Sequence, residues 1–270
     1  MTVESQGEGS ARSDVVYGVQ GGVWMKWVAI SNPGRVRTTN EDGALTGPGM
    51  FLLADGMGGH DAGEVASAAA LEALAEVFGP EPEDAQVVME QVVDRLRQAH
   101  AAIEAIDSET GKRAGTTVTG VLLTTYDGVP HWLVVNIGDS RTYRLAEGYF
   151  EQLTVDHSQV QELINGGFLS PEQARVDPRR NVITRALGAG MEPDADFWIV
   201  PAQPHERLLV CSDGLNGELT DDEISAILDS DAAIDECADH LVESALNAGG
   251  RDNVTVIVVD ATTENFADNW

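Results

Sequence analysis

The sequence predicts an α+β protein in which strands and helices form layers. Several short runs rich in Val, Ile, Thr and Trp, each bounded by turn residues, have the composition of β-strands. Some of these runs are apolar on both faces, which is typical of strands covered on both sides. Other segments have the apolar spacing of helices, and strands and helices are grouped along the chain rather than strictly alternating. A layered sandwich is therefore favoured over a doubly wound sheet.

The predicted strands are spread over most of the chain. In single-letter code they are WMKWVAI, MFLLA, TTVTGVLLTTY, HWLVVNIG, DFWIV, RLLVCS and NVTVIVVD. Only Thr255 interrupts the apolar run of the last one, which indicates a central strand of a sheet. Residues 1–22 precede the first strand, and their Gly, Ser and acidic content predicts a flexible leader.

The predicted helices include a long pair over residues 62–78 and 83–107 and a shorter pair over 221–229 and 232–247. The second long segment has one apolar face, made by side chains spaced three and four residues apart: Val88, Val92, Leu96, Ala99, Ile103 and Ile106.

Residues 154–180 are predicted to form an inserted subdomain. This polar stretch lies between predicted strands, and a Gly-Gly pair and Pro171 divide it into short helices. We expect residues 23–260 to form a single domain that contains this insertion, followed by a C-terminal tail at 261–270.

The composition excludes several classes of protein. The net charge is −29, with 45 acidic and 16 basic side chains and no basic block, so nucleic-acid binding is not expected. Cys211 and Cys237 are the only cysteines and are far apart in the sequence, which excludes a disulfide framework or a CxxC zinc site. No apolar stretch is long enough to span a membrane and the N-terminus is unlike a signal peptide. We therefore expect a cytoplasmic monomer that does not associate with a membrane.

Acidic residues recur at the ends of the predicted strands. They are Asp55, Asp139, Asp213 and Asp252, with Glu41 and Asp42 in the motif RTTNED. A single Asp-Gly pair is usually only a turn. Carboxylates that converge at one edge of a sandwich would repel one another unless a cation balanced them. Because oxygen ligands without His or Cys select hard cations, the pattern predicts a site for Mg²⁺ or Mn²⁺.

Arg37 precedes Glu41 by four residues and adds a positive charge to this predicted site. An arginine fork can bind two phosphate oxygens at once, although a surface arginine on an acidic protein is the simpler interpretation of this residue alone. A metal cluster beside an arginine is suited to phosphoester hydrolysis.

These motifs resemble those of the metal-dependent protein phosphatases, the PPM or type 2C serine/threonine phosphatases, and in particular their compact bacterial members. The motifs follow in order between about residues 23 and 260: RTTNED, LADGMGGHDAGEVAS, GTTVTG, NIGDSRTY, ITRALG, CSDGL and GGRDNVTV. The resemblance implies a four-layer αββα sandwich, in which two antiparallel β-sheets are flanked by helices on both outer sides.

The resemblance also implies a ligand set for two or three Mn²⁺ or Mg²⁺ ions per chain. Asp55 would bridge two ions. Asp213 and Asp252 would complete the first, and Glu41 and the Gly56 carbonyl would bind the second.

Three further roles follow from the same resemblance. Asp139 would hold a third ion together with Asp213. Asp42 would orient a metal-bound water. Arg37 would bind the substrate phosphate, so that Arg37, Asp55 and Asp213 are the expected catalytic residues.

The implied reaction is hydrolysis of phosphoserine and phosphothreonine in proteins by direct attack of a metal-bridging water or hydroxide, which opposes serine/threonine kinases. The expected partners are phosphorylated proteins, including such a kinase. Some relatives carry a His after the Asp-Gly pair as the acid for the leaving group, and here that position is Met57. We expect His60 to pack or cap at the start of the following helix, and metal-bound water to supply the proton.

The insertion at 154–180 corresponds to the flap that this family carries beside its metal site. It is expected to contact the phosphopeptide, and His157 and Arg185 are the residues on the flap side that we would test first.

Two alternatives remain open at this point. One is a catalytically silent phosphoprotein-binding module on the same fold, which the intact ligand set disfavours. The other is a phosphatase that acts on anti-sigma-factor antagonists. Such enzymes commonly lack the phosphate-binding arginine, whereas this chain has Arg37.

Overall fold

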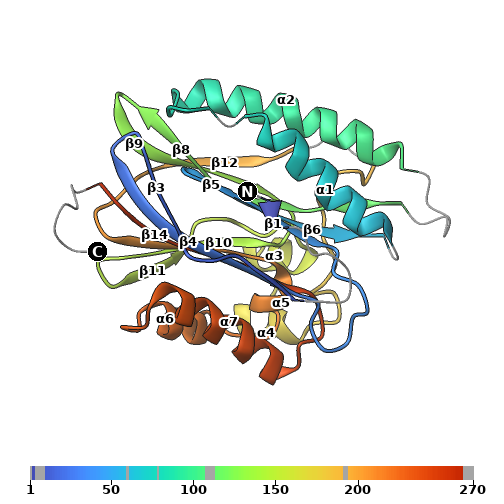
Figure 1. Ribbon diagram of the computed structural model, residues 1–270. Coiled ribbons are helices and arrows are strands. Elements are labelled where there is room, and N and C mark those ends of the chain that lie inside the picture. Colours follow the sequence, from blue (N-terminus) through green and yellow to red (C-terminus); the bar gives the residue numbers. More distant parts are fainter. Residues whose placement is uncertain are drawn as a thin grey trace.

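In the computed structural model of the chain, two seven-stranded antiparallel sheets pack face to face, with helices on both outer faces (Figure 1). This confirms the predicted αββα sandwich. The structure describes residues 2–3, 10–58, 61–77, 79–106, 113–190 and 194–263. In this part of the chain, no helix is both long and apolar enough to cross a membrane.

The first sheet has the strand order β1-β5-β6-β8-β9-β12, and β7 pairs with β6. Its strands are β1 (Thr2–Val3), β5 (Asp42–Gly47), β6 (Met50–Met57), β7 (Gly115–Thr116), β8 (Val118–Tyr126), β9 (Val129–Ile137) and β12 (Asp196–Pro201). Two helices, α1 (Asp61–Ala75) and α2 (Ala85–Glu104), cover its outer face (Figure 1).

The second sheet has the order β11-β10-β13-β14-β4-β2, and β3 pairs with β4. Its strands are β2 (Ala11–Arg12), β3 (Val16–Gln20), β4 (Val23–Asn32), β10 (Arg141–Ala146), β11 (Tyr149–Gln152), β13 (Glu206–Cys211) and β14 (Val254–Thr262). The helices α5 (Asp213–Asn216), α6 (Asp221–Leu228) and α7 (Ile234–Ala248) cover its outer face.

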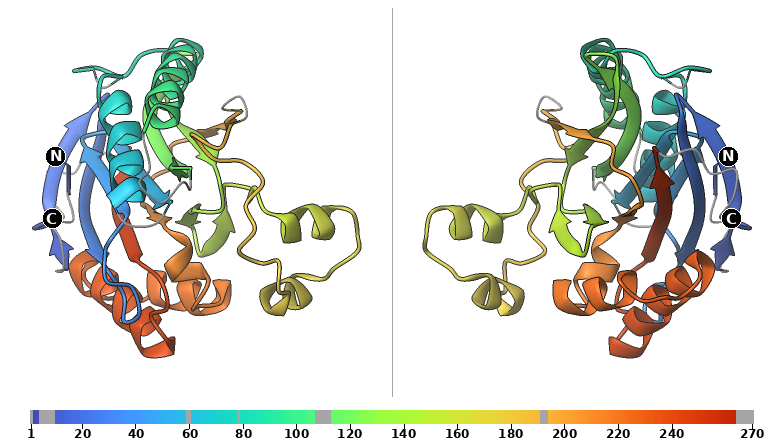
Figure 2. Two further views of the ribbon diagram at one scale, coloured as in Figure 1. Left: turned by 90° about the vertical axis from the view of Figure 1, so that its right-hand side faces the viewer. Right: turned by 90° about the vertical axis from the view of Figure 1, so that its left-hand side faces the viewer.

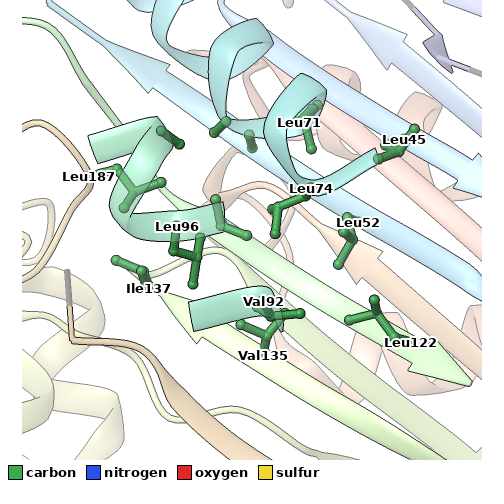
Figure 3. Close-up of a cluster of buried hydrophobic side chains, with 14 of the residues drawn as sticks. Leu45, Leu52, Leu71, Leu74, Val92, Leu96, Leu122, Val135, Ile137 and Leu187 are labelled. Atoms are coloured by element: carbon green, nitrogen blue, oxygen red, sulfur yellow. The ribbon is translucent and has the colours of Figure 1, made fainter. Parts of the chain in front are cut away.

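Strand β6 shows why the sequence lacks a simple apolar–polar alternation. Leu52 points outward and packs under α1 and α2 with Leu74 and Leu96 (Figure 3). Phe51 points the other way into the layer between the sheets, where its ring lies 5.3 Å from that of Trp27. Both faces of the strand are therefore buried, as the sequence predicted.

The helices match the predicted ones with small shifts at their ends. Helix α2 begins after Asp84, whose side chain accepts a hydrogen bond from the Gln86 amide and caps the helix. Its buried face contains the predicted residues from Val88 to Ile103, whereas Ile106 lies just beyond the helix end.

The prediction of a flexible leader over residues 1–22 was wrong for residues 11–12 and 16–20, because both segments form strands paired with β4. Val16 lies opposite Trp27 and packs against the layer between the sheets. Burial alternates along β3, but the polar composition around it concealed this short pattern. The predicted tail also begins too early, since β14 continues to Thr262. Residues 264–270 lie outside the described residues.

The insertion forms the two short helices expected from the sequence, α3 (Gln159–Asn165) and α4 (Pro171–Val176). They project to one side of the sandwich (Figure 2). Ser158 and Ser170 cap them, and Ser170 forms a capping box with Gln173. We refer to residues 154–180 as the flap.

Candidate metal and phosphate site

The predicted acids lie where strands of both sheets end. In the first sheet, Asp42 begins β5 and lies directly opposite Asp55 near the end of β6. Asp139 follows β9. In the second sheet, Asp213 follows β13 as the first residue of α5, and Asp252 precedes β14 by two residues. The prediction that Asp213 simply ends a strand therefore missed α5, whose four residues are too few to show a helical period.

The electrostatics of Asp55 show that these acids converge. Burial, followed by repulsion from Asp42, Asp213, Asp139 and Asp252, raises the pKa of Asp55 well above its usual range. Acids on separate surfaces would be screened from one another by water. The structure therefore brings together the acids that the sequence placed at separate strand ends.

Neighbouring carboxyls are shifted in the same direction. Burial, with repulsion from Asp252, raises the pKa of Asp213 to about 6, while Arg37 opposes the shift. Burial raises the pKa of Asp42 to about 7, although the hydroxyls of Ser212 and Thr255 oppose it. The pKa of Asp139 is raised well above its usual range by burial and then by Asp213.

Glu41 completes the acidic group next to Asp42. Its pKa is raised mainly by burial, and Arg37 opposes the shift. Within the described residues, Glu41 Oε1 and both carboxylate oxygens of Asp42 are buried and have no hydrogen-bond partner of normal geometry. Buried oxygens without partners are costly for a folded protein, and a divalent cation would relieve that cost.

The glycines of the motif DGMGGHDAG allow the backbone to approach Glu41 closely. A Cβ atom on Gly56 would lie 2.2 Å from the Gly63 carbonyl oxygen and 2.6 Å from the Glu41 carbonyl oxygen. A Cβ atom on Gly63 would lie 2.6 Å from Glu41 Oε1. Only glycine lets the end of β6 and the start of α1 enclose this carboxylate.

Arg37 lies at the mouth of this acidic group. Its Nη2 atom donates to Asp252 Oδ2 over 2.6 Å, and half of its side chain is exposed. A guanidinium has five N–H donors, so this one contact leaves others to serve an anion. The structure thus places the predicted phosphate-binding cation beside the predicted metal ligands.

Hydroxyl and amide side chains that sequence reasoning left without a role hold these acids in place. Thr117 Oγ1 accepts from the Asp55 amide over 3.0 Å and lies 2.8 Å from Ser140 Oγ, which links Asp55 to the residue after Asp139. Asn253 Oδ1 accepts from the Glu41 amide over 2.9 Å. All three lie in the recognised motifs GTTVTG, NIGDSRTY and GGRDNVTV, which was the available signal.

The predicted flap residues lie beside the acidic group rather than within it. His157 is buried and contacts Gly138 and Asp196, and Arg185 donates to Asp196 Oδ1 over 2.9 Å. Met57 is half-buried at the end of β6, and His60 lies outside the described residues.

The donor set fits Mg²⁺ or Mn²⁺ in its chemistry, since it consists of carboxylates and a backbone carbonyl. Among the described residues, no group of three or more His, Cys, Asp or Glu side chains is already arranged to hold one ion. The buried oxygen without a partner at Glu41 supports the fit.

Comparisons with known proteins identify the family of the chain. The family model described as "Protein phosphatase 2C" matches residues 39–248. The serine/threonine protein phosphatase PstP of Mycobacterium tuberculosis is 38% identical over 244 residues, which make up 90% of this chain and 46% of PstP. The serine/threonine phosphatase stp of Listeria monocytogenes is 35% identical over 245 residues, or 84% of this chain and 92% of stp. The chain thus spans about half the length of the first relative and nearly all of the second.

Solved structures of phosphatases are also similar to this chain. The crystal structure of the M. tuberculosis phosphatase PstP/Ppp superposes with a TM-score of 0.78 at 37% identity, covering 87% of this chain and 98% of that one. The catalytic domain of PstP in complex with two manganese ions superposes with a TM-score of 0.75 at 37% identity, covering 89% of this chain and 99% of that one.

Proposed function

Because the chain belongs to the protein phosphatase 2C family, we propose that it hydrolyses phosphoserine and phosphothreonine in proteins and depends on Mn²⁺ or Mg²⁺. The observation that carries the proposal is the convergence of Asp42, Asp55, Asp139, Asp213 and Asp252 at one end of the sandwich. Related proteins are named serine/threonine phosphatases, and one related structure is described with two manganese ions.

We assign the metal-holding roles to the acids at the strand ends. Asp55 would bridge two ions, with Asp213 and Asp252 on one and Glu41 and the Gly56 carbonyl on the other. Bound Mn²⁺ or Mg²⁺ would lower the pKa of a coordinated water and offset negative charge on the phosphate. A third ion at Asp139 and Asp213 is part of the proposal, so that two or three ions bind per chain.

The chain's own residues would position the substrate. Arg37 would bind two phosphate oxygens with its planar fork, since its guanidinium already lies beside Asp252 at the exposed edge of the site. Asp42, which is buried opposite Asp55 on the neighbouring strand, would orient water without touching phosphate. The acid that protonates the leaving group stays unassigned among side chains, and we retain the hypothesis that a water supplies the proton. A His60→Ala variant with collapsed turnover and an altered acid limb of the pH profile would contradict it.

The catalytically silent alternative is not supported, because the proposed ligand set and Arg37 are complete and the relatives are named as phosphatases. The presence of Arg37 also continues to disfavour a phosphatase specialised for anti-sigma-factor antagonists. A kinase partner, a cytoplasmic location and a monomeric state stay predictions from the sequence.

The test uses the purified chain, p-nitrophenyl phosphate and a phosphothreonine peptide. We expect turnover of both with Mn²⁺, loss of turnover with EDTA, and recovery when excess Mn²⁺ is added. An Arg37→Ala variant should raise KM for the peptide more than it lowers kcat, since its proposed role is to bind phosphate. Mn²⁺ binding without turnover of any phosphoprotein would show instead that the domain is a binding module.

A further inference from the structure

The flap begins beside Asp139. Two consecutive residues near its start, Asp156 and His157, contact residues on either side of that acid. On the N-terminal side, His157 and Gly138 form a pair of hydrogen bonds. The His157 amide donates to the Gly138 carbonyl over 2.8 Å, and the Gly138 amide donates to His157 Nδ1 over 3.1 Å. His157 is 5% exposed, so water does not compete strongly for these bonds.

The backbone conformation and the surroundings of Gly138 are both restricted. Its φ angle is +109°, which favours glycine, and a Cβ atom there would lie 2.5 Å from Thr117 Cγ2. The Asn136 side chain donates to both the Gly138 carbonyl and the Val155 carbonyl over 3.1 Å. The turn that carries Asp139 is thus tied to the start of the flap by side chain and backbone.

On the C-terminal side of Asp139, Arg141 forms an ion pair with Asp156, the flap residue that precedes His157. Arg141 Nε donates to Asp156 Oδ1 over 2.9 Å and its Nη2 donates to Asp156 Oδ2 over 2.7 Å. Both side chains are mostly buried, and a two-pronged arginine–carboxylate contact fixes orientation as well as distance.

The chain that follows the flap returns to the same histidine. Since a backbone N–H can only donate, Nδ1 of His157 is an acceptor and the ring proton is on Nε2, which donates to Asp196 Oδ2 over 3.1 Å. Arg185 donates to the other oxygen of Asp196, and the Thr184 amide donates to the His157 carbonyl over 2.7 Å. His157 therefore links the start of the flap and the segment that follows the flap to the turn that carries Asp139.

We propose that His157 is a positioning residue that couples the flap to Asp139, with the Arg141–Asp156 contact as the second half of the same clamp. The clamp holds Asp139 in position to bind a divalent cation. Without the clamp, both Asp139 and the flap would be less ordered. This inference deepens the proposed function and rests on it for the identity of the cation. It adds residues that hold Asp139 without touching phosphate or metal.

The chain offers amide substitutions that separate the two ring contacts of His157. In His157→Asn the side-chain oxygen lies near the former Nδ1 position and can still accept from Gly138. In His157→Gln the amide reaches the former Nε2 position, near Asp196, and leaves the Gly138 amide without its acceptor. His131→Ala is the matched control, because His131 is at the opposite end of β9 and its ring contacts the nearby Val129 carbonyl and the Tyr126 ring, away from Asp139.

The first readout is Mn²⁺ binding in the absence of substrate, which is measured by electron paramagnetic resonance. We expect His157→Ala and His157→Gln to weaken Mn²⁺ binding at the site that includes Asp139 by about tenfold or more, the size usual for residues that orient a ligand. His157→Asn should retain most of the affinity, and His131→Ala should match the wild type. In turnover assays the same loss should appear as a higher Mn²⁺ requirement and a lower kcat, with KM for p-nitrophenyl phosphate little changed.

The second readout is a double-mutant cycle with Asp139→Asn. If His157 acts through Asp139, then His157→Ala should weaken Mn²⁺ binding no further once Asp139 has been replaced. Trypsin cleavage at the flap arginines Arg175, Arg179 and Arg180 should be faster in His157→Ala than in the wild type, and unchanged in Asp139→Asn. Should His157→Ala fold poorly, Arg141→Lys keeps the charge, removes the two-pronged contact and should show the same Mn²⁺ defect.

Two results would overturn the proposal. One is wild-type Mn²⁺ affinity in both His157→Ala and Arg141→Lys. The other is Mn²⁺ affinity that is retained in His157→Gln but lost in His157→Asn, which would assign the effect to the contact with Asp196 instead of the contact with Gly138. A wild-type protein that binds Mn²⁺ but fails to hydrolyse phosphopeptides would count against the proposed function alone. The Mn²⁺-binding and trypsin measurements would still test the clamp.

Discussion

The two ends of strand β14 show opposite ways of placing an acid in a folded protein. Near its end, Asp260 lies between two cations: Arg207 donates to both of its oxygens over 2.6 and 3.0 Å, and Lys26 lies 3.3 Å away. About 20 Å along the strand, beyond Val254, Asp252 belongs to a group of acids that repel one another. We call these the paired end and the acidic end of the sandwich.

The difference shows that the fold itself does not require the acidic end to be unbalanced. Both ends belong to the same sheet, and at the paired end the chain supplies its own cations. At the acidic end, Arg37 contacts Asp252, while burial raises the pKa of Asp55 and Asp139 well above the usual range. Acids kept in that condition cost folding free energy, which is the expected sign of a functional site.

The largest expected effect is on activity at the acidic end. Asp213→Asn should lower kcat with Mn²⁺ by more than about 100-fold, because loss of a direct ligand should exceed the usual cost of losing an orienting residue. The same change should raise the melting temperature in EDTA, since one repelling carboxylate has been removed. Both quantities can be measured on one preparation by peptide hydrolysis and thermal unfolding. A metal-free variant that melts below the wild type would refute the view that these acids repel.

The matching change at the paired end should have the opposite profile. Asp260→Asn removes the partner of two cations, and Arg207 is largely buried. We expect the free energy of unfolding to fall by about 2 to 3 kcal/mol, near the lower limit for breaking a buried ion pair, because these groups are partly exposed. Urea denaturation in EDTA gives this number, and turnover should stay within about twofold of wild type. If activity collapsed while stability held, the two ends would not be independent.

Cation binding should stabilise the protein through the acidic end alone. At a Mn²⁺ concentration 100-fold above the dissociation constant, one site adds about 2.7 kcal/mol to the free energy of unfolding. We expect Asp260→Asn to gain as much from Mn²⁺ as the wild type does, and Asp213→Asn to gain clearly less. Differential scanning calorimetry with and without Mn²⁺ makes the comparison. An equal gain in stability in both variants would indicate that Mn²⁺ binds away from the acidic end.

The sequence predicted the layers, and it placed the acids at strand ends, because both features depend on local patterns. Runs that are apolar on both faces identified the central strands, and a polar residue at the end of a buried strand is a local signal. Residue spacing could not show which ends meet, since that depends on pairings such as Asp42 opposite Asp55 across β5 and β6. The resemblance to a known family supplied this long-range information.

What the sequence missed follows a physical pattern as well. Strands β5, β10 and β11 lack a continuous apolar run, because β5 contains an Asp and two Gly, β10 contains two Arg, and β11 has only four residues. The supporting roles of Thr117, Ser140 and Asn253 depend on contacts between residues far apart in the chain. A hydroxyl or amide side chain alone gives no sign of such a contact.

The smallest expected effect is a pH dependence that separates the two ends without any change in ligands. In EDTA, the pKa of Asp213 is about 6 and that of Asp42 about 7 in the folded state, against an ordinary value of 3.8. Between about pH 4 and pH 7 the folded protein therefore holds protons that the unfolded chain has released. The contribution of these two groups to stability is complete below about pH 4 and is lost as the pH rises through 6 and 7.

Urea midpoints measured in EDTA across this range should therefore fall as pH rises, and Asp213→Asn should flatten the slope while Asp260→Asn leaves it unchanged. Saturating Mn²⁺ should oppose the slope, because the cation binds the deprotonated carboxylates and competes with protons. A metal-free protein whose stability increased steadily from pH 4 to pH 7 would mean that the acidic end is balanced by the chain's own cations, as the paired end is.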